Sequence, residues 1–159
     1  MNKFSSIGRN MMISDKYFKL YLRDCLMPYE LNSAEGIVLL MMYQKLYDTT
    51  ADNTLYGQTQ DELIRQLHYD KGVMTRTMKE LEQKGYVLRT TNPKDSRSYV
   101  FTLSKKGIAF QDTIFDILVK WNNNLLESIS KEDLEIVEAT LTKMSYNASK
   151  YYHENHSDK

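Results

Sequence analysis

The feature that most constrains this chain is a change of hydrophobic period within residues 71–103. In the first part, KGVMTRTMKELEQ, the residues Met74, Met78 and Leu81 fall on one stripe of an α-helix. From residue 86 onward, apolar and polar side chains alternate instead, which is the two-residue period of half-buried β-strands. A helix followed by an antiparallel hairpin satisfies both periods.

Residues that commonly begin or end helices and form turns lie at the expected ends of the helix and of the two strands. Asp70 precedes the helix, where its carboxylate can cap the first turn, and Gly85 follows it, where a residue that tolerates positive φ can end a helix. Between the two strand-like runs lies NPKDSR, residues 92–97, which is rich in turn formers. We therefore expect an exposed turn over these six residues, with Lys94 and Arg97 at its tip.

The helix has a second stripe, well round from the apolar one, whose members are small, polar or basic: Gly72, Thr75, Arg76 and Lys79. One face can be buried while the other meets an anionic partner. The whole chain balances 21 basic against 21 acidic residues, but residues 58–107 hold ten basic and six acidic residues. Such a local excess of positive charge is expected of a nucleic-acid-binding region.

A shorter helix is predicted just before this stretch, over residues 60–67. Thr59 and Glu62 match a capping box, in which the threonine hydroxyl and the glutamate carboxylate satisfy each other's backbone amides. Two short helices joined by a tight turn, the second with a polar outer face, form a helix-turn-helix. The expected buried side chains of the first are Leu63, Ile64 and Leu67.

Further helices are expected before this region. Residues 14–27 predict a helix with a broad buried face, ended by the proline that follows. After a cap at Asn32 or Ser33, a helix through residue 47 is apolar nearly all round, so we expect it at the centre of the fold. Residues 48–57 form a polar loop. The apolar positions of the first helix include Tyr17, Leu20 and Tyr21.

Two long helices are expected after the hairpin. Ser104 caps the first, whose apolar residues recur at helical spacing from Phe110 to Leu125. A second capping box at residues 130–133 opens the last helix. Its apolar positions alternate three and four residues apart, which is a heptad seam suited to packing on another long helix, so we expect a dimer interface. These positions are Leu134, Val137, Leu141, Met144, Ala148 and Tyr151.

Composition and length exclude several classes of protein. With 159 residues, 42% of them hydrophobic, the chain can form one domain with a real core or two lobes that share helices. The most apolar run, residues 37–43, is too short to cross a bilayer, and no export signal precedes residue 14. With Cys25 as its single cysteine, we expect a cytoplasmic protein in which this thiol is an inert packing residue.

No catalytic set is evident. The three histidines lie in separate contexts, and neither a glycine-rich phosphate loop nor a Ser-His-Asp arrangement is present, so we expect no enzyme activity and no cofactor. His153 and His156 lie in a polar tail, and two ligands without a fixed third make a poor metal site. One hypothesis is nevertheless that these two histidines bind a metal ion that controls the protein.

The order of elements resembles the MarR family of bacterial transcription regulators. The resemblance covers almost the whole chain and is strongest over residues 60–107, where QDELIRQL, DKGVMTRTMKELEQKGYVLR and NPKDSRSYVFTLSKKG look like that family's first motif helix, recognition helix and wing. The most specific part is an aspartate two residues before an arginine, followed by a strand that ends in Leu-Ser-x-x-Gly, here Asp95, Arg97 and residues 103–107. The implied fold is mainly α with a small β-hairpin wing.

The resemblance implies a homodimer that binds double-stranded operator DNA. Residues 58–107 would form the DNA-binding region, residues 1–47 and 108–159 the dimerisation region, and residues 48–57 a connecting loop longer than is usual in the family. Members of the family often act as repressors that a small lipophilic or aromatic ligand releases from DNA. The ligand would shift the population toward dimers whose two DNA-binding regions are no longer spaced to match successive major grooves. The peroxide-sensing members keep their cysteine earlier than Cys25, so redox sensing is not supported.

Several residues receive roles from this resemblance. Thr75, Arg76 and Lys79 can meet base edges and phosphates, and Arg97 suits the negative potential of a narrow minor groove. Asp95 would hold a neighbouring arginine, Arg97 or Arg89, in position. The proposed DNA-binding set is Lys71, Thr75, Arg76, Lys79, Arg89, Lys94, Asp95 and Arg97, with Lys71, Lys94 and Lys105 as phosphate contacts. The alternative is a winged-helix dimer that serves as a protein-interaction or ligand-binding module without DNA binding.

Overall fold

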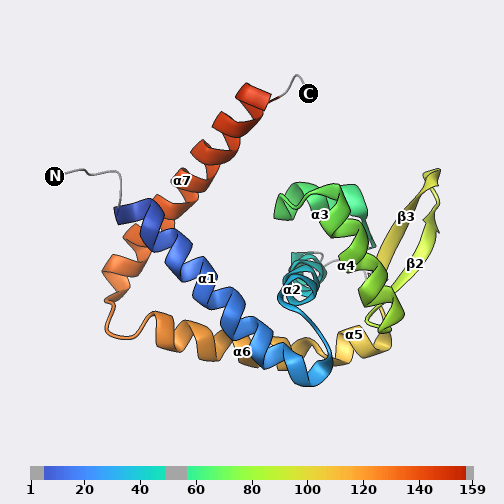
Figure 1. Ribbon diagram of the computed structural model, residues 1–159, viewed down its shortest axis with the longest axis horizontal. Helices are drawn as coiled ribbons and strands as arrows, with labels where there is room; N and C mark the ends of the chain where they lie inside the picture. Colours follow the sequence, from blue (N-terminus) through green and yellow to red (C-terminus); the bar gives the residue numbers. More distant parts are fainter. Residues whose placement is uncertain (1–5, 49–56, 157–159) are drawn as a thin grey trace. The chain divides into compact units, whose positions relative to one another are not determined.

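The computed structural model describes residues 6–48 and 57–156, and it confirms a mainly helical fold with a small antiparallel sheet (Figure 1). The described residues fall into two compact units, divided between Trp121 and Asn122. No helix within the described ranges combines the length and apolarity that a bilayer span requires. The helices are α1 (Ser6–Leu26), η1 (Met27–Tyr29), α2 (Ser33–Asp48), α3 (Gln60–Leu67), α4 (Lys71–Gln83), α5 (Lys105–Ala109), α6 (Gln111–Leu125) and α7 (Lys131–His156).

Helix α1 begins at Ser6, so the residues before 14, for which the sequence left open an arm or the start of a helix, belong to the helix from Ser6 onward. It ends at Leu26, and the proline then lies in the short helix η1, as expected of a residue that cannot continue the hydrogen-bond pattern. Leu22 and Leu26 are completely buried. Tyr17 is 57% exposed, so its expected place on the buried face was wrong.

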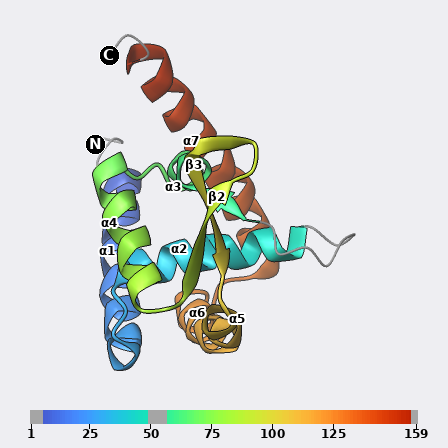
Figure 2. The same cartoon turned by 90° about the vertical axis from the view of Figure 1, so that its right-hand side faces the viewer.

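Helix α2 lies at the centre of the first unit, as predicted, and packs against α1, α3 and α4 (Figure 2). Its start is fixed by a reciprocal cap, in which the Asn32 N–H donates to Glu35 Oε2 (2.7 Å) and the Glu35 N–H donates to Asn32 Oδ1 (3.0 Å). The side chains that it contributes to the core are Val38, Leu39, Met42 and Tyr43.

Helices α3 and α4 form the predicted helix-turn-helix. The expected capping box is present, since the Thr59 N–H donates to Glu62 Oε2 (2.7 Å) and the Glu62 N–H donates to Thr59 Oγ1 (3.3 Å). Asp70 caps α4 by accepting the Val73 N–H at 2.8 Å. The apolar stripe of α4 is buried as predicted, and it comprises Met74, Met78 and Leu81.

The sheet has three strands in the order β1-β3-β2, with β1 at Gln58–Thr59, β2 at Val87–Asn92 and β3 at Asp95–Leu103. The sequence did not predict β1, because two residues are too few to show an alternating pattern. The turn is also shorter than expected: strand pairing continues to Asn92 and Asp95, which leaves Pro93 and Lys94 between the strands. The register shifts between Thr91 and Asn92, so the outer end of the hairpin is irregular.

The helix expected after Ser104 is divided into α5 and α6 at Phe110. The Phe110 ring is buried between Tyr29 and Tyr86, with ring centroids 4.9 Å and 5.3 Å away, and this packing accompanies the change of direction. In α5, Ser104 Oγ accepts the Gly107 N–H at 3.0 Å, as expected of a cap.

Helix α7 begins at its predicted cap, where Ser130 Oγ accepts the Asp133 N–H (3.1 Å) and the Ser130 hydroxyl donates to Asp133 Oδ2 (2.8 Å). Its heptad positions are largely uncovered in the single chain: Val137 is 48% exposed, Leu141 40% and Tyr151 69%. An amphipathic helix whose apolar stripe is open to water lacks its packing partner.

Candidate nucleic-acid interface

The outward face of α4 carries four residues of the proposed set. Lys71, Thr75, Arg76 and Lys79 are all exposed, while the opposite stripe of the same helix is buried in the core. The Asp70 cap and the buried methionines therefore fix the rotation of α4, so that its polar face points away from the protein.

Thr75 already has hydrogen-bond partners on this face. Its hydroxyl donates to the Lys71 carbonyl oxygen at 2.7 Å, and its oxygen accepts from Gln60 Nε2 at 2.5 Å. The hydroxyl proton is thus used within the protein, which leaves the methyl group and one lone pair for a partner. The sequence pattern missed Gln60, although a helix-turn-helix brings the start of its first helix close to the second.

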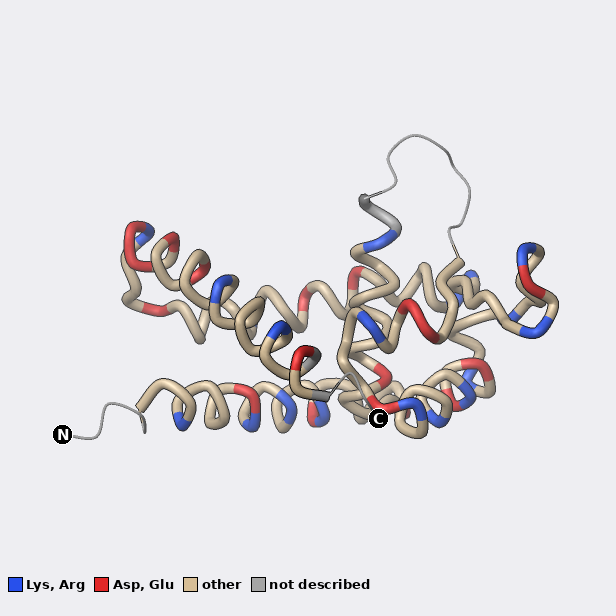
Figure 3. The backbone as a smooth tube through the Cα atoms, turned by 90° about the horizontal axis from the view of Figure 1, so that it is seen from above, with Lys and Arg blue, Asp and Glu red and all other residues tan. Residues whose placement is uncertain are grey.

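The outer end of the hairpin carries Lys94, Asp95 and Arg97, all of them exposed; charged positions gather there in Figure 3. Asp95 Oδ1 accepts the backbone N–H of Arg97 at 3.0 Å, and Asn92 Oδ1 accepts the backbone N–H of Lys94 at 3.0 Å. Of the two arginines that the resemblance offered to Asp95, the structure brings Arg97 to it, and the contact is made with the backbone of Arg97, so Asp95 shapes the turn.

Arg89 differs from the other proposed DNA contacts. Its Nε atom lies 3.3 Å from Glu82 Oε1 in the last turn of α4, and its guanidinium carbon lies 4.5 Å from the centre of the Tyr99 ring. Arg89 is not the arginine that Asp95 holds, because Arg89 pairs with Phe101 across the strands, whereas Asp95 pairs with Asn92 at the outer end of the hairpin. Neither Glu82 nor Tyr99 was singled out from the sequence.

A groove of about 480 Å³ separates α4 from the sheet. Met78 and Phe101 contribute apolar surface to it, and Lys79, Glu82 and Arg89 contribute charge. The full lining is Gln60, Thr75, Met78, Lys79, Glu82, Gln83, Arg89, Tyr99 and Phe101.

The end of α4 is anchored by several polar contacts. Lys84 Nζ lies 2.6 Å from Glu35 Oε1 of α2, and Lys106 Nζ donates to the Lys84 carbonyl oxygen at 2.8 Å. The Lys106 ammonium also lies 4.1 Å from the centre of the Tyr86 ring. Burial raises the pKa of the Tyr86 phenol above its ordinary value. These contacts tie α4 to the core and to the start of α5.

Other candidate chemistry is sparse. Cys25 is partly buried, in keeping with a packing role. No group of three potential metal ligands occurs among the residues that the structure describes. The side chains of His153 and His156 lie outside the described residues.

Comparison with known proteins agrees with this architecture. The model of the MarR family matches residues 54–99. The chain is 31% identical over 128 residues to the HTH-type transcriptional regulator BilQ of Clostridioides difficile, covering 80% of each protein. It is 30% identical to the regulator SarZ of Staphylococcus aureus, covering 69% of this chain and 78% of SarZ.

Solved structures share the fold over nearly the whole chain. A MarR transcriptional regulator from Methanosarcina mazei is 27% identical, with a TM-score of 0.79 over 91% of this chain and 97% of its own. An Escherichia coli MarR mutant in complex with operator DNA is 23% identical, with a TM-score of 0.74 over 90% and 96% of the two chains. The chain therefore belongs to the MarR family and is a transcriptional regulator, not an enzyme.

Proposed function

We propose that this regulator is a cytoplasmic homodimer that binds a specific double-stranded operator and represses transcription until a small lipophilic or aromatic ligand releases it. The observation that carries the proposal is the exposed polar and basic face of α4, set beside a hairpin with a basic outer end in the same compact unit. Residues 58–107 would be the DNA-binding region, and residues 1–47 and 108–159 the dimerisation region.

On DNA, α4 would enter the major groove. Arg76 can pair with the two acceptors of guanine, and Lys79 can reach a base edge or a phosphate. Thr75 would contribute mainly its methyl group, because its hydroxyl is held by Lys71 and Gln60. The complex of the Escherichia coli MarR mutant with operator DNA, a protein of the same fold, supports the proposal that this chain binds an operator.

The hairpin would contact DNA beside the major groove. Arg97 at its outer end suits a narrow minor groove, where the negative potential is strongest. Lys71, Lys94 and Lys105 are exposed and would contact phosphates, which set affinity and salt dependence more than sequence preference. Asp95 would act through the turn that it shapes.

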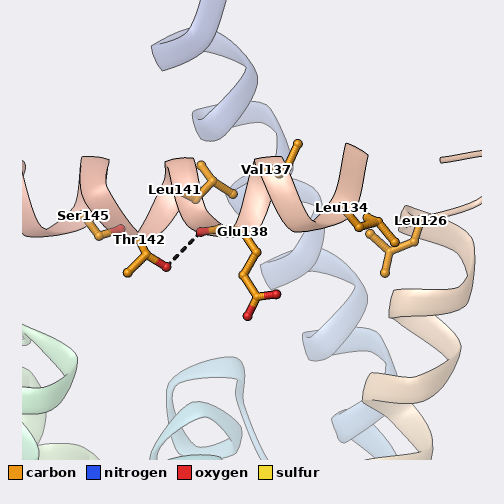
Figure 4. Close-up of a pocket in the computed structure, with 7 residues that line it drawn as sticks. All are labelled: Leu126, Leu134, Val137, Glu138, Leu141, Thr142 and Ser145. Atoms are coloured by element: carbon orange, nitrogen blue, oxygen red, sulfur yellow. Dashed lines mark hydrogen bonds between the residues drawn. The ribbon is translucent and has the colours of Figure 1, made fainter. Parts of the chain in front are cut away.

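A second copy of the chain would cover the apolar stripe of α7. A groove of about 630 Å³ runs along this helix, lined by Leu126, Leu134, Val137, Glu138, Leu141, Thr142 and Ser145 (Figure 4). The aliphatic side chains in it recur at heptad spacing, which suits a symmetric helix pair. A dimer would present two copies of α4, one for each half of a palindromic operator.

Ligand release would be a population shift. The ligand would bind more tightly to a dimer whose two α4 helices have a different spacing from the one that DNA requires. It could lower the affinity for the operator at most by the ratio of its own affinities for the two forms of the dimer. The methionine and tyrosine side chains of the chain, nine and 12 in number, suit a lipophilic or aromatic guest.

The test is a mobility-shift titration of the purified protein with DNA from upstream of its own gene and with random DNA of equal length. We expect tighter binding to the upstream fragment, and we expect Arg76→Ala to abolish that preference. The matched control is Arg65→Ala, which removes an exposed arginine from α3. Equal affinity of the wild-type protein for both DNAs would refute the specific-regulator function and favour the alternative of an interaction module without DNA binding.

A further inference from the structure

We propose that Arg89 is a positioning residue that ties the wing, residues 87–103, to α4 through Glu82 and Tyr99, and that it does not contact DNA itself. The inference rests on the proposed function, because it concerns how the wing and α4 are held in the arrangement that one DNA duplex requires.

A single guanidinium, carried by β2, contacts two other elements. Arg89 lies on β2, and its Nε atom is 3.3 Å from Glu82 Oε1 in the last turn of α4. Its guanidinium carbon is 4.5 Å from the centre of the Tyr99 ring on β3. Arg89 pairs with Phe101 across the strands and Thr91 pairs with Tyr99, so Arg89 and Tyr99 are diagonal neighbours on one face of the sheet. That face lines the groove beside α4.

Arg89 is also the one cation of the proposed DNA-binding set that has a carboxylate partner among the ion pairs of residues 6–48 and 57–156. A phosphate could bind Arg89 only by displacing Glu82, whose own negative charge would then face the DNA backbone. Lys94 and Arg97, at the outer end of the wing, can bind a phosphate without first displacing a carboxylate.

The contacts of Arg89 with Glu82 and Tyr99 lie where little else holds the wing against α4. The groove of about 480 Å³ leaves little apolar packing between α4 and the outer part of the wing. A planar guanidinium can bind a carboxylate with its edge and stack on an aromatic ring with its face, which an ammonium cannot do. Arg89 therefore limits the angle between wing and α4 at the place where packing is thin.

The experiment uses the full-length protein and the upstream duplex that the wild-type protein binds specifically. Its affinity is measured by fluorescence anisotropy at several salt concentrations, for the wild-type protein and for Glu82→Gln, Arg89→Ala, Tyr99→Leu and Tyr99→Phe. Asp61→Asn is the charge control, since it removes an exposed carboxylate from α3. Thermal unfolding of each variant reports on its fold.

Glu82→Gln gives the sharpest outcome, because the two roles of Arg89 predict opposite signs. If Arg89 positions the wing, Glu82→Gln weakens specific binding. The expected loss is roughly fivefold for each DNA-binding region of the dimer, which is the size of effect that an exposed ion pair can have. If Arg89 binds phosphate, removal of the competing carboxylate leaves binding unchanged or tightens it, as Asp61→Asn is expected to do.

The remaining variants make the same distinction. We expect Tyr99→Leu to weaken binding and Tyr99→Phe, which keeps the ring, to bind like the wild-type protein. Arg89→Ala should lower affinity without changing the dependence on salt, whereas loss of a phosphate contact would reduce the slope by about one for each head. A reduced slope, or unchanged or tighter binding by Glu82→Gln, would overturn the positioning role alone. Failure of the wild-type protein to distinguish the two DNAs would refute the proposed function as well.

Discussion

Lys84 Nζ lies 2.6 Å from Glu35 Oε1, and the Glu35 side chain is completely buried while that of Lys84 is 29% exposed. The carboxylate has a second task, because its Oε2 atom accepts the Asn32 N–H that begins α2. One acidic group thus joins the start of the central helix to the end of α4. The pair links the core to the element that we propose enters the major groove.

Lys84→Met is expected to destabilise the protein by roughly 3 kcal/mol, because it leaves the Glu35 carboxylate buried without its partner. Urea unfolding followed by circular dichroism measures the change. Lys79→Met, on the exposed face of the same helix, should stay within about 0.5 kcal/mol of the wild-type protein. Equal stability of the two variants would show that the ion pair does not support the fold.

Glu62 gives a prediction about pH. The hydrogen bond from the Thr59 N–H holds the pKa of the Glu62 carboxyl below its usual range. A group whose pKa is lower in the folded state stabilises the fold above its unfolded pKa and loses this effect as the pH falls through the folded pKa. Glu62→Gln should therefore be less stable than the wild-type protein at pH 7, with the difference disappearing in acid below the ordinary glutamate value of 4.5. A difference that stays constant in urea unfolding from pH 7 to pH 3 would contradict this.

The sequence predicted those parts of the fold that local chemistry determines. The Thr59–Glu62 capping box, the Asp70 cap and the left-handed Gly85 (φ 77°) all lie where residue type and spacing placed them. The order of the elements, read from these local patterns, then revealed the resemblance to the MarR family. Local signals sufficed because each cap is satisfied within three or four residues of the chain.

Contacts between distant residues were not predictable in the same way. The Glu82–Arg89 pair depends on the angle at which the hairpin leaves α4, and the register shift at Asn92 accompanies hydrogen bonds that the Asn92 side chain makes within the turn. Strand β1 exists only because β3 offers it an edge. The division at Phe110 likewise follows from ring packing with Tyr29 and Tyr86, which residue spacing does not encode.

Three glycines should respond differently to alanine. A Cβ at Gly107 would fall on the backbone carbonyl oxygen of Tyr86, so Gly107→Ala must separate α5 from the sheet and should cost at least about 3 kcal/mol. Gly85→Ala meets no atom but keeps a positive φ, so a loss of about 1 kcal/mol is expected. Gly8→Ala, in the open first turns of α1, should stabilise slightly. Thermal unfolding gives the order, and a Gly107→Ala protein as stable as Gly85→Ala would exclude the close approach.

The outer end of the wing should contribute electrostatically to DNA binding. Lys94→Ala is expected to weaken binding to specific and random DNA alike and to reduce the salt slope by about one for each head, as loss of a phosphate contact does. Arg97→Lys keeps the charge but should still lose preference for the specific duplex, because a guanidinium suits a narrow minor groove better than an ammonium. Anisotropy titrations at several salt concentrations separate these effects; wild-type specificity in Arg97→Lys would remove Arg97 from sequence recognition.

The apolar stripe of α7 provides the test of dimerisation. Leu141 is 40% exposed in the single chain and lines the apolar groove of this helix. In a dimer its side chain would be buried, so Leu141→Glu places a charge in the interface and should shift the protein to monomers at micromolar concentration. Lys143→Glu, two residues further along α7 and outside the lining of the groove, is the matched control and should leave the assembly unchanged.

Analytical ultracentrifugation measures the assembly directly, and DNA titration of the same samples shows its consequence. In a dimer, once one DNA-binding region is bound to its half of the operator, the other is held close to the second half and binds it more readily. The monomeric variant lacks this effect, so its affinity for the operator should fall by a factor of about 100 or more. The helix-turn-helix of the Leu141→Glu protein should still fold, because the compact unit that contains α4 does not contain Leu141. A Leu141→Glu protein that sediments as the wild-type protein does would show that the seam of α7 is not the dimer interface.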